Sequence, residues 1–193
     1  MQLDGIALDA RDAAARIDHT VLAPDATRAD MEKACAVARS YGFRAVFTNP
    51  YWSPLVAELL DGSGIAAGIS AAFPLGSIST ESKVREVMDV VERLDGKPCA
   101  VDMVTNIGLL KEKRYADYTA DIRAVVRAVQ GRAMEVKAIL ETSLLTPEEI
   151  RAACLCAAEA SADYAKTSTG RAGAPSLEHI AIMKAALPPS VGV

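Results

Sequence analysis

The stretch TPEEIRAACLCAAEASADYAKTSTG, residues 146–170, contains one complete helix–strand unit, and similar units recur along the chain. Thr146 is followed by proline at the first helical position and by Glu149, a capping-box pattern that strongly predicts a helix start. Residues 164–169 are then predicted to form a short strand that stops at Gly170. A strand and a helix repeated about every 30 residues predict a parallel sheet with helical crossovers.

The remaining elements are predicted from turn residues and hydrophobic spacing. Val84, Val87 and Val91 recur at helical spacing, which makes the helix over residues 79–94 the clearest. Further strands are predicted at 17–22, 45–48, 65–73, 99–106 and 134–141, with the start of a last strand at 191–193. Further helices are predicted at 8–15, 27–41 (capped by Thr27 and ended by Gly42), 54–60, around 122–129 and at 177–187.

Two α/β architectures fit this alternation, an open doubly wound sheet and a closed eight-fold barrel. No Gly-x-Gly-x-x-Gly or P-loop run follows a predicted strand, which disfavours the nucleotide-binding open sheets. A (β/α)8 TIM-type barrel normally needs ~250 residues and eight units. This chain has 193 residues, six full units and the start of a seventh. We therefore expect residues 1–193 to form a single, incomplete barrel domain that lacks the final strand-seven and strand-eight portion.

Composition excludes several classes of function. The chain is 51% hydrophobic and 24% charged, which suits a folded core. A net charge of −4 gives no reason to expect a nucleic-acid or anionic-membrane partner. No apolar run reaches the ~18 residues that span a bilayer, and the N-terminus does not resemble a secretory signal. We expect a cytoplasmic protein whose four cysteines are free thiols.

Lys166 is the most informative polar residue, because it falls inside a predicted buried strand. A desolvated ammonium loses several kcal/mol of hydration. It can form an ion pair, reach solvent with its head group, or lower its pKa. The last outcome makes lysine a nucleophile toward carbonyl groups.

Two other charged residues lie inside predicted strands. Asp102 is expected to be either paired or chemically active. Lys137 shares one strand face with Glu135 and Glu141 by the period of two. It is interpreted as the ion-pair partner of these acids or as a second interior cation, and we favour the first.

The remaining candidates are weaker. Asp18 could orient a polar network, and His19 could be a core histidine. His179 is expected on the surface of a helix. With two histidines in the chain, a histidine-rich metal site is not expected.

In order and spacing, six motifs resemble those of the deoxyribose-phosphate aldolase family, from about Arg16 to the end of the chain. The motifs are IDHTVL (17–22), FTNPY (47–51), FPLG (73–76), VDMVTNIG (101–108), KAILET (137–142) and KTSTG (166–170). The KTSTG run combined with the upstream VDMV is the specific part of this resemblance.

The resemblance implies a class I aldolase that uses no metal and no cofactor. It would cleave 2-deoxy-D-ribose 5-phosphate reversibly to acetaldehyde and D-glyceraldehyde 3-phosphate. Lys166 would be the Schiff-base lysine, and Asp102 with an ordered water would shuttle protons. The implied substrate-binding residues are Asp18, Asn106, Lys137, Thr169, Gly170 and Arg171, with Arg171 near the phosphate.

The chemistry of an imine is consistent with these roles. The attacking amine must be neutral, so lowering a lysine pKa from about 10.4 to about 7 takes roughly 4 kcal/mol. Apolar strand neighbours can supply part of this free energy, and a nearby second cation can supply more.

Two departures from the family pattern stand out. Phe47 replaces a cysteine common in the family, which we expect to alter packing or aldehyde tolerance rather than abolish the reaction. The family continues beyond the position of Val193 with a lysine, a Gly-Gly loop and an eighth strand, so the chain resembles a C-terminally truncated member.

Three interpretations therefore remain open. The chain is a deoxyribose-phosphate aldolase, a folded but inactive relative that acts as a binding or scaffold protein, or a class I aldolase for another sugar phosphate. We expect little turnover by residues 1–193 alone. Open sheet edges also make a homodimer plausible.

Overall fold

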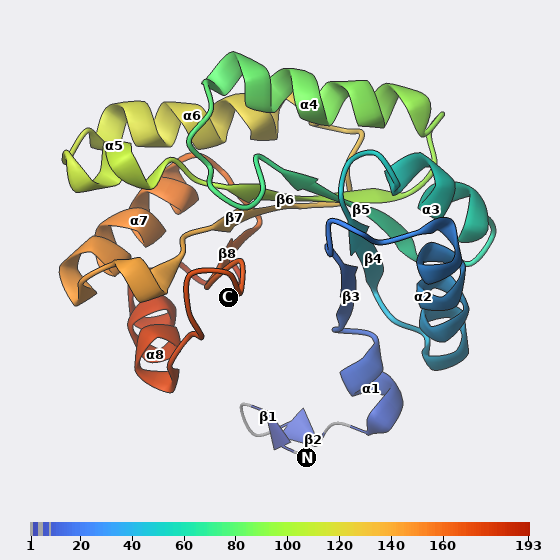
Figure 1. Ribbon diagram of the computed structural model, residues 1–193. Coiled ribbons are helices and arrows are strands. Elements are labelled where there is room, and N and C mark those ends of the chain that lie inside the picture. The colour runs from blue at the N-terminus through green and yellow to red at the C-terminus, as the bar shows by residue number, and fades with distance from the viewer. Residues whose placement is uncertain (1, 4–5, 8) are drawn as a thin grey trace.

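The computed structural model describes residues 2–3, 6–7 and 9–193. Its centre is a six-stranded parallel sheet in which every strand pairs with the next along the chain, in the order β3-β4-β5-β6-β7-β8. The sheet curls into a half-barrel (Figure 1). Its strands are β3 (Asp18–Val21), β4 (Ala45–Thr48), β5 (Ala66–Ala71), β6 (Cys99–Val104), β7 (Val136–Ile139) and β8 (Tyr164–Lys166). A short antiparallel pair, β1 (Gln2–Leu3) with β2 (Ile6–Ala7), precedes them.

Helices cover the convex face of the sheet (Figure 1). The concave face borders a hollow that Asp18, Lys137, Lys166 and the C-terminal Val193 help to line. The helices are α1 (Ala10–Ala14), α2 (Arg28–Tyr41), α3 (Ser53–Leu59), α4 (Thr80–Arg93), α5 (Ile107–Lys111), α6 (Tyr115–Ala128), α7 (Pro147–Glu159) and α8 (Leu177–Ala186), with a 3-10 turn η1 (Thr142–Leu144). The predicted TIM-type architecture and strict strand–helix alternation are confirmed as a curled half-barrel. No helix in the described part of the chain is long and apolar enough to cross a membrane.

Helix ends follow the predicted signals closely. Thr27 and Asp30 form the capping box of α2, and Gly42 ends the helix in the left-handed conformation with φ of 70°. Thr146 caps α7 together with Glu149, and proline occupies the first turn. The predicted helix at 8–15 corresponds to α1, although residue 8 lies outside the described residues.

Several predicted boundaries were wrong. The strand expected at 164–169 ends at Lys166, and the strand expected at 191–193 is reduced to one parallel bridge between Tyr164 and Gly192. Helix α5 was not predicted, because its five residues are too few to show helical periodicity. All four cysteines are free, as expected, and the structure also shows all of them buried.

The two faces of the sheet have different compositions. Side chains on the convex face, such as Val46, Ile69 and Met103, are fully buried in the main apolar core. The concave face carries Phe47 and Gly68, paired across β4 and β5, and a separate small cluster of alanines. Thus the apolar face anchors the helices, and the charged residues Asp18, Asp102, Lys137 and Lys166 of the strands cluster on the concave side.

Phe47 fits inside the curled sheet because its cross-strand neighbour Gly68 has no side chain. It is 1% exposed, and a Cβ at Gly68 would lie 2.3 Å from the Cγ of Phe47. Ala45, Ala66 and Ala100 complete the small-residue layer around it. The aromatic ring therefore fills space that glycine and alanines leave free.

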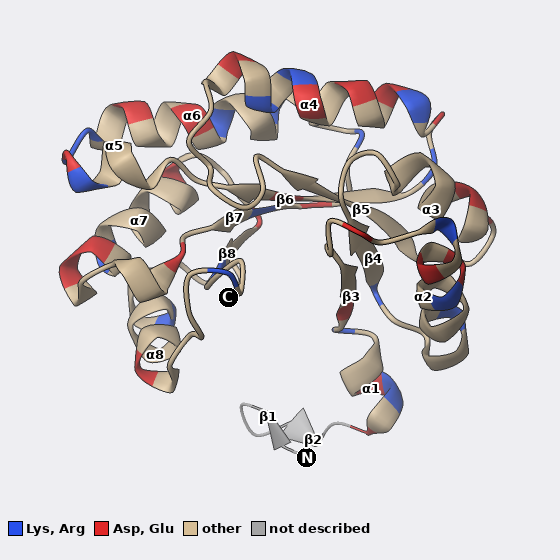
Figure 2. Cartoon of the chain, viewed as in Figure 1, with Lys and Arg blue, Asp and Glu red and all other residues tan. Residues whose placement is uncertain are grey.

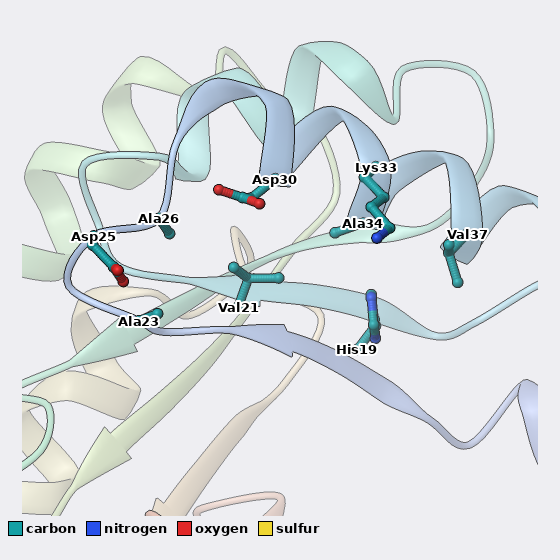
Figure 3. Close-up of a pocket in the computed structure, with 9 residues that line it drawn as sticks. All are labelled: His19, Val21, Ala23, Asp25, Ala26, Asp30, Lys33, Ala34 and Val37. Carbon is teal, nitrogen blue, oxygen red and sulfur yellow. The ribbon is translucent and has the colours of Figure 1, made fainter.

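The first strand of the sheet, β3, has no strand on its outer side within residues 9–193. A groove of about 420 Å³ runs between β3 and α2 at this edge. His19 and Val21 of β3 and Lys33 of α2 point into it (Figure 3). His19 is half-buried with its ring centroid 5.5 Å from that of Phe43, so it is a packed histidine at the sheet edge.

A buried ion pair joins two of the covering helices. Lys83 of α4 is completely buried, and its Nζ lies 2.6 Å from Oδ2 of Asp121 in α6. It also donates to the backbone oxygen of Val104 at 3.1 Å, at the end of β6. Burial lowers the pKa of Lys83, and Asp121 partly offsets this shift. The pair fixes α4 and α6 against the sheet.

Candidate active site

Lys166 closes β8, and its side chain points to the interior of the curled sheet. Its Nζ donates a hydrogen bond to Oδ2 of Asp102. The Lys166 side chain is 33% exposed, whereas that of Asp102 is 3% exposed. The amine therefore sits between a buried carboxylate and the open hollow, where a small molecule can reach it.

Lys137 lies beside this pair because strand register places it there. Asp102 of β6 and Lys137 of β7 are direct partners across the sheet. The Nζ of Lys137 hydrogen-bonds Asp18, lies 2.9 Å from Oε1 of Glu135 and lies 3.9 Å from Oδ1 of Asp102. Figure 2 shows that acidic and basic positions occur on the strands of the sheet as well as on the helices. The interior thus holds a connected cluster of two lysines and three carboxylates.

Asp102 is the most strongly buried acid of this cluster. Burial raises its pKa above the usual value of 3.8, and the neighbouring Lys166 and Lys137 ammonium groups partly oppose that rise. Its Oδ1 makes no hydrogen bond with the described residues. A carboxyl group with a raised pKa and a free oxygen is suited to accept and return protons.

The cavity in front of this cluster has a volume of about 780 Å³. Lys166, Lys137 and Asp18 line its inner wall, and Arg44 lies at the opposite end of the strands. Arg44 donates to Oη of Tyr164 at 3.1 Å and pairs with Glu135. A cavity with several cations on its walls is suited to an anionic ligand.

Phe47 contacts both lysines across the hollow. The centroid of its ring lies 4.8 Å from Nζ of Lys137 and 5.4 Å from Nζ of Lys166. Both distances lie within the range in which an aromatic face attracts a cation. The phenylalanine therefore packs against both lysines of the cluster.

The segment after Lys166 carries the other predicted binding residues. Thr169 donates its backbone N–H and its hydroxyl to the carboxylate of Glu141. Gly170 has φ of 76°, a left-handed turn suited to glycine. Arg171 is exposed, and its Nη2 donates to the backbone oxygen of Leu22 at 3.1 Å.

The structure brings some sequence-predicted residues together and leaves others apart. Lys166, Asp102, Lys137 and Asp18 form the cluster described above. Asn106 is the N-cap residue of α5 without a side-chain capping bond, and no hydrogen bond joins it to the cluster within residues 9–193.

Two expectations about single residues were wrong. Lys137 pairs with Glu135 as expected but not with Glu141, because β7 ends at Ile139 and the alternation of faces does not extend to residue 141. His179 is half-buried rather than on the surface, since its Nδ1 lies 3.1 Å from Oγ1 of Thr142 in η1.

A curled parallel sheet with a lysine and a buried carboxylate inside its hollow is typical of β/α-barrel lyases that act through a lysine. No family model matches the chain. Curated relatives do: the chain is 45% identical to deoxyribose-phosphate aldolase 1 of Bacillus licheniformis over 178 residues, which cover 92% of this chain and 78% of that protein. It is 43% identical to the deoxyribose-phosphate aldolase of Halalkalibacterium halodurans over 185 residues, covering 95% and 81%. The chain belongs to the deoxyribose-phosphate aldolase family.

Solved structures agree with this assignment. A structure from Coccidioides immitis assigned to deoxyribose-phosphate aldolase superposes with a TM-score of 0.85 at 38% identity, covering 94% of this chain and 70% of that chain. The tetrameric deoxyribose phosphate aldolase of Aeropyrum pernix superposes with a TM-score of 0.76 at 29% identity, covering 84% and 67%.

Proposed function

We propose that this protein is a class I aldolase that cleaves 2-deoxy-D-ribose 5-phosphate reversibly to acetaldehyde and D-glyceraldehyde 3-phosphate. Family membership supports the reaction. The observation that carries the mechanism is the contact between Nζ of Lys166 and the buried carboxylate of Asp102. The scaffold interpretation has no observation in its favour.

In this mechanism the neutral amine of Lys166 attacks C1 of the sugar aldehyde and forms a C–N bond. Proton transfer to the resulting hydroxyl releases water and leaves an iminium. Removal of the proton from the C3 hydroxyl then breaks the C2–C3 bond, and the iminium accepts the electron pair as an enamine. Glyceraldehyde 3-phosphate leaves, the enamine carbon takes up a proton, and water hydrolyses the remaining imine to acetaldehyde and free Lys166.

Asp102 is proposed to move these protons, through an ordered water. Its raised pKa brings the pH at which it exchanges its proton closer to neutral pH. Lys137 is proposed to hold Asp102 and Asp18 in place through its contacts with both carboxylates. Thr169, Gly170, Arg171 and Asn106 are proposed to bind the substrate, with Arg171 near its phosphate.

The proposal is tested by single-turnover release of acetaldehyde, with the full 193-residue chain in excess over 2-deoxyribose 5-phosphate. The wild type is expected to release acetaldehyde, and Lys166→Leu is expected to release none. Lys111→Met is the matched control, because Lys111 pairs with Glu149 on the surface and should react as the wild type does. Equal release by Lys166→Leu and the wild type would contradict the proposed nucleophile.

Four finer points stay predictions. A panel of sugar phosphates in the same assay separates deoxyribose phosphate from another aldehyde substrate. The expectation of little multiple-turnover activity is checked with substrate in excess. Sedimentation checks the proposed homodimer, and cell fractionation checks the proposed cytoplasmic location.

A further inference from the structure

Glu141 is an anomaly in both its backbone and its side chain. It is 2% exposed and has φ of 56° and ψ of 57°, the left-handed region that non-glycine residues adopt at a cost. None of the cations in residues 9–193 forms an ion pair with its carboxylate. A buried charge on a strained residue persists only where its surroundings hold it, so its partners indicate its role.

These partners all lie in the segment that follows Lys166. The carboxylate accepts the backbone N–H of Thr169 at 3.2 Å and the hydroxyl proton of the same residue. The Thr169 oxygen in turn accepts the backbone N–H of Arg171 at 3.1 Å. One carboxylate therefore fixes the turn through Gly170, and hydrogen bonds to an ionised acceptor are among the stronger ones in proteins.

Backbone pairing on both sides of Glu141 keeps it in register with this segment. The residue before it, Leu140, donates to the backbone oxygen of Lys166 at 2.9 Å, and the residue after it, Thr142, donates to that of Thr167 at 2.8 Å. The left-handed conformation at 141 lets both neighbours pair with the segment while the carboxylate also faces it. Arg171, at the far end, reaches the end of β3 across the hollow.

We propose that Glu141 is a positioning residue that fixes residues 167–171 behind the Schiff-base lysine, and so places the groups that bind the anionic end of the substrate. The inference rests on the proposed function for its link to substrate. Its structural part concerns the free protein alone and can be tested without turnover.

The test is amide hydrogen exchange on the full chain in the wild type, Glu141→Ala, Glu141→Gly and Glu141→Gln. Loss of a hydrogen bond to a charged acceptor predicts about ten- to a hundredfold faster exchange at Thr169 and its neighbours in the alanine and glycine variants. Glutamine keeps one acceptor and should give a smaller increase. Glycine adopts the left-handed backbone without strain, so Glu141→Gly should denature at a higher urea concentration than Glu141→Ala. Amide exchange in residues 167–171 should nevertheless be equally fast in these two variants.

Glu86→Gln is the matched control. Glu86 also accepts a backbone N–H at the end of a strand, that of Ala72 at 2.7 Å, but it lies away from the segment. It should leave exchange at 167–171 unchanged. Wild-type protection of this segment in Glu141→Gly, or acceleration spread evenly over the whole molecule, would overturn the proposal.

A second readout connects the inference to substrate. With the enzyme in excess, the enzyme concentration that gives a half-maximal single-turnover rate should rise about tenfold or more in Glu141→Gly while the maximal rate falls less, because a misplaced segment weakens binding more than chemistry. Borohydride with acetaldehyde alone should still label Lys166. An unlabelled Lys166 in the wild type would contradict the proposed function and not this inference. A lower maximal single-turnover rate with an unchanged half-maximal enzyme concentration would contradict the inference.

Discussion

Replacing Lys137 with methionine should damage the interior cluster more than any other single change outside Lys166. The ammonium of Lys137 hydrogen-bonds Asp18, pairs with Glu135 at 2.9 Å and lies 3.9 Å from Asp102. Its side chain is 5% exposed, so water cannot take its place freely. Methionine has a similar length, so the change removes the charge and leaves the volume nearly filled.

The expected loss of unfolding free energy is about 3–5 kcal/mol, the range measured when one partner of a buried ion pair is removed. This is a large part of the roughly 5–15 kcal/mol that stabilises a typical domain. Adding Asp18→Asn to Lys137→Met should recover about 1 kcal/mol or more, because one of the uncompensated carboxylates is then neutral. Urea denaturation followed by the fluorescence of Trp52, the only tryptophan of the chain, measures both values.

The pKa of Asp102 gives a second readout of the same variant. Burial raises this pKa, and Lys137 is one of the two cations that lower it. Lys137→Met should therefore raise the pKa of Asp102 further, which a carboxyl-carbon NMR titration detects. Lys83→Met is the control: it removes another buried lysine and should cost similar stability, but it leaves the Asp102 titration unchanged. A stability loss below about 1 kcal/mol, or no rescue by Asp18→Asn, would refute the reasoning.

Two further predictions follow from the interior of the sheet. Gly68→Ala places a Cβ 2.3 Å from Cγ of Phe47 and should cost about 1–3 kcal/mol by overpacking, whereas the added Phe47→Ala, which removes Cγ, should relieve part of this cost. An unchanged denaturation midpoint in Gly68→Ala would contradict this overpacking. The pKa of Asp102 is raised on folding, so its contribution to stability is fully present below its ordinary pKa of 3.8 and is lost as pH rises through the folded value. The unfolding free energy of Asp102→Asn minus that of the wild type should thus increase as pH rises above 3.8. A difference that does not change with pH would contradict the raised pKa of Asp102 in the folded state.

The sequence predicted the helix termini best, because capping is local chemistry. Thr27, Gly42 and Thr146 occupy the predicted cap positions. Strand ends were predicted less well. The strands expected at 65–73 and 134–141 end at Ala71 and Ile139, because the chain turns away from the sheet there to build the loops at the site.

Contacts between residues far apart in the chain could not be predicted from the sequence. The sequence placed Asp102 and Lys166 inside predicted strands, but their contact depends on the curl of the sheet and on register across β6, β7 and β8. The burial of Lys83 depends on Asp121 of another helix, which no local pattern indicates. The role of Glu141 was missed because alternation was extended past the end of β7, where the backbone is left-handed.

Reductive trapping tests the central claim most directly. The full chain is incubated with 2-deoxyribose 5-phosphate and, separately, with acetaldehyde, then reduced with borohydride, digested and mapped by mass spectrometry. The account predicts one modified lysine, Lys166, with labelling absent in Lys166→Leu and unchanged in Lys111→Met. An adduct on Lys137 or on surface lysines, with Lys166 unmodified, would contradict it.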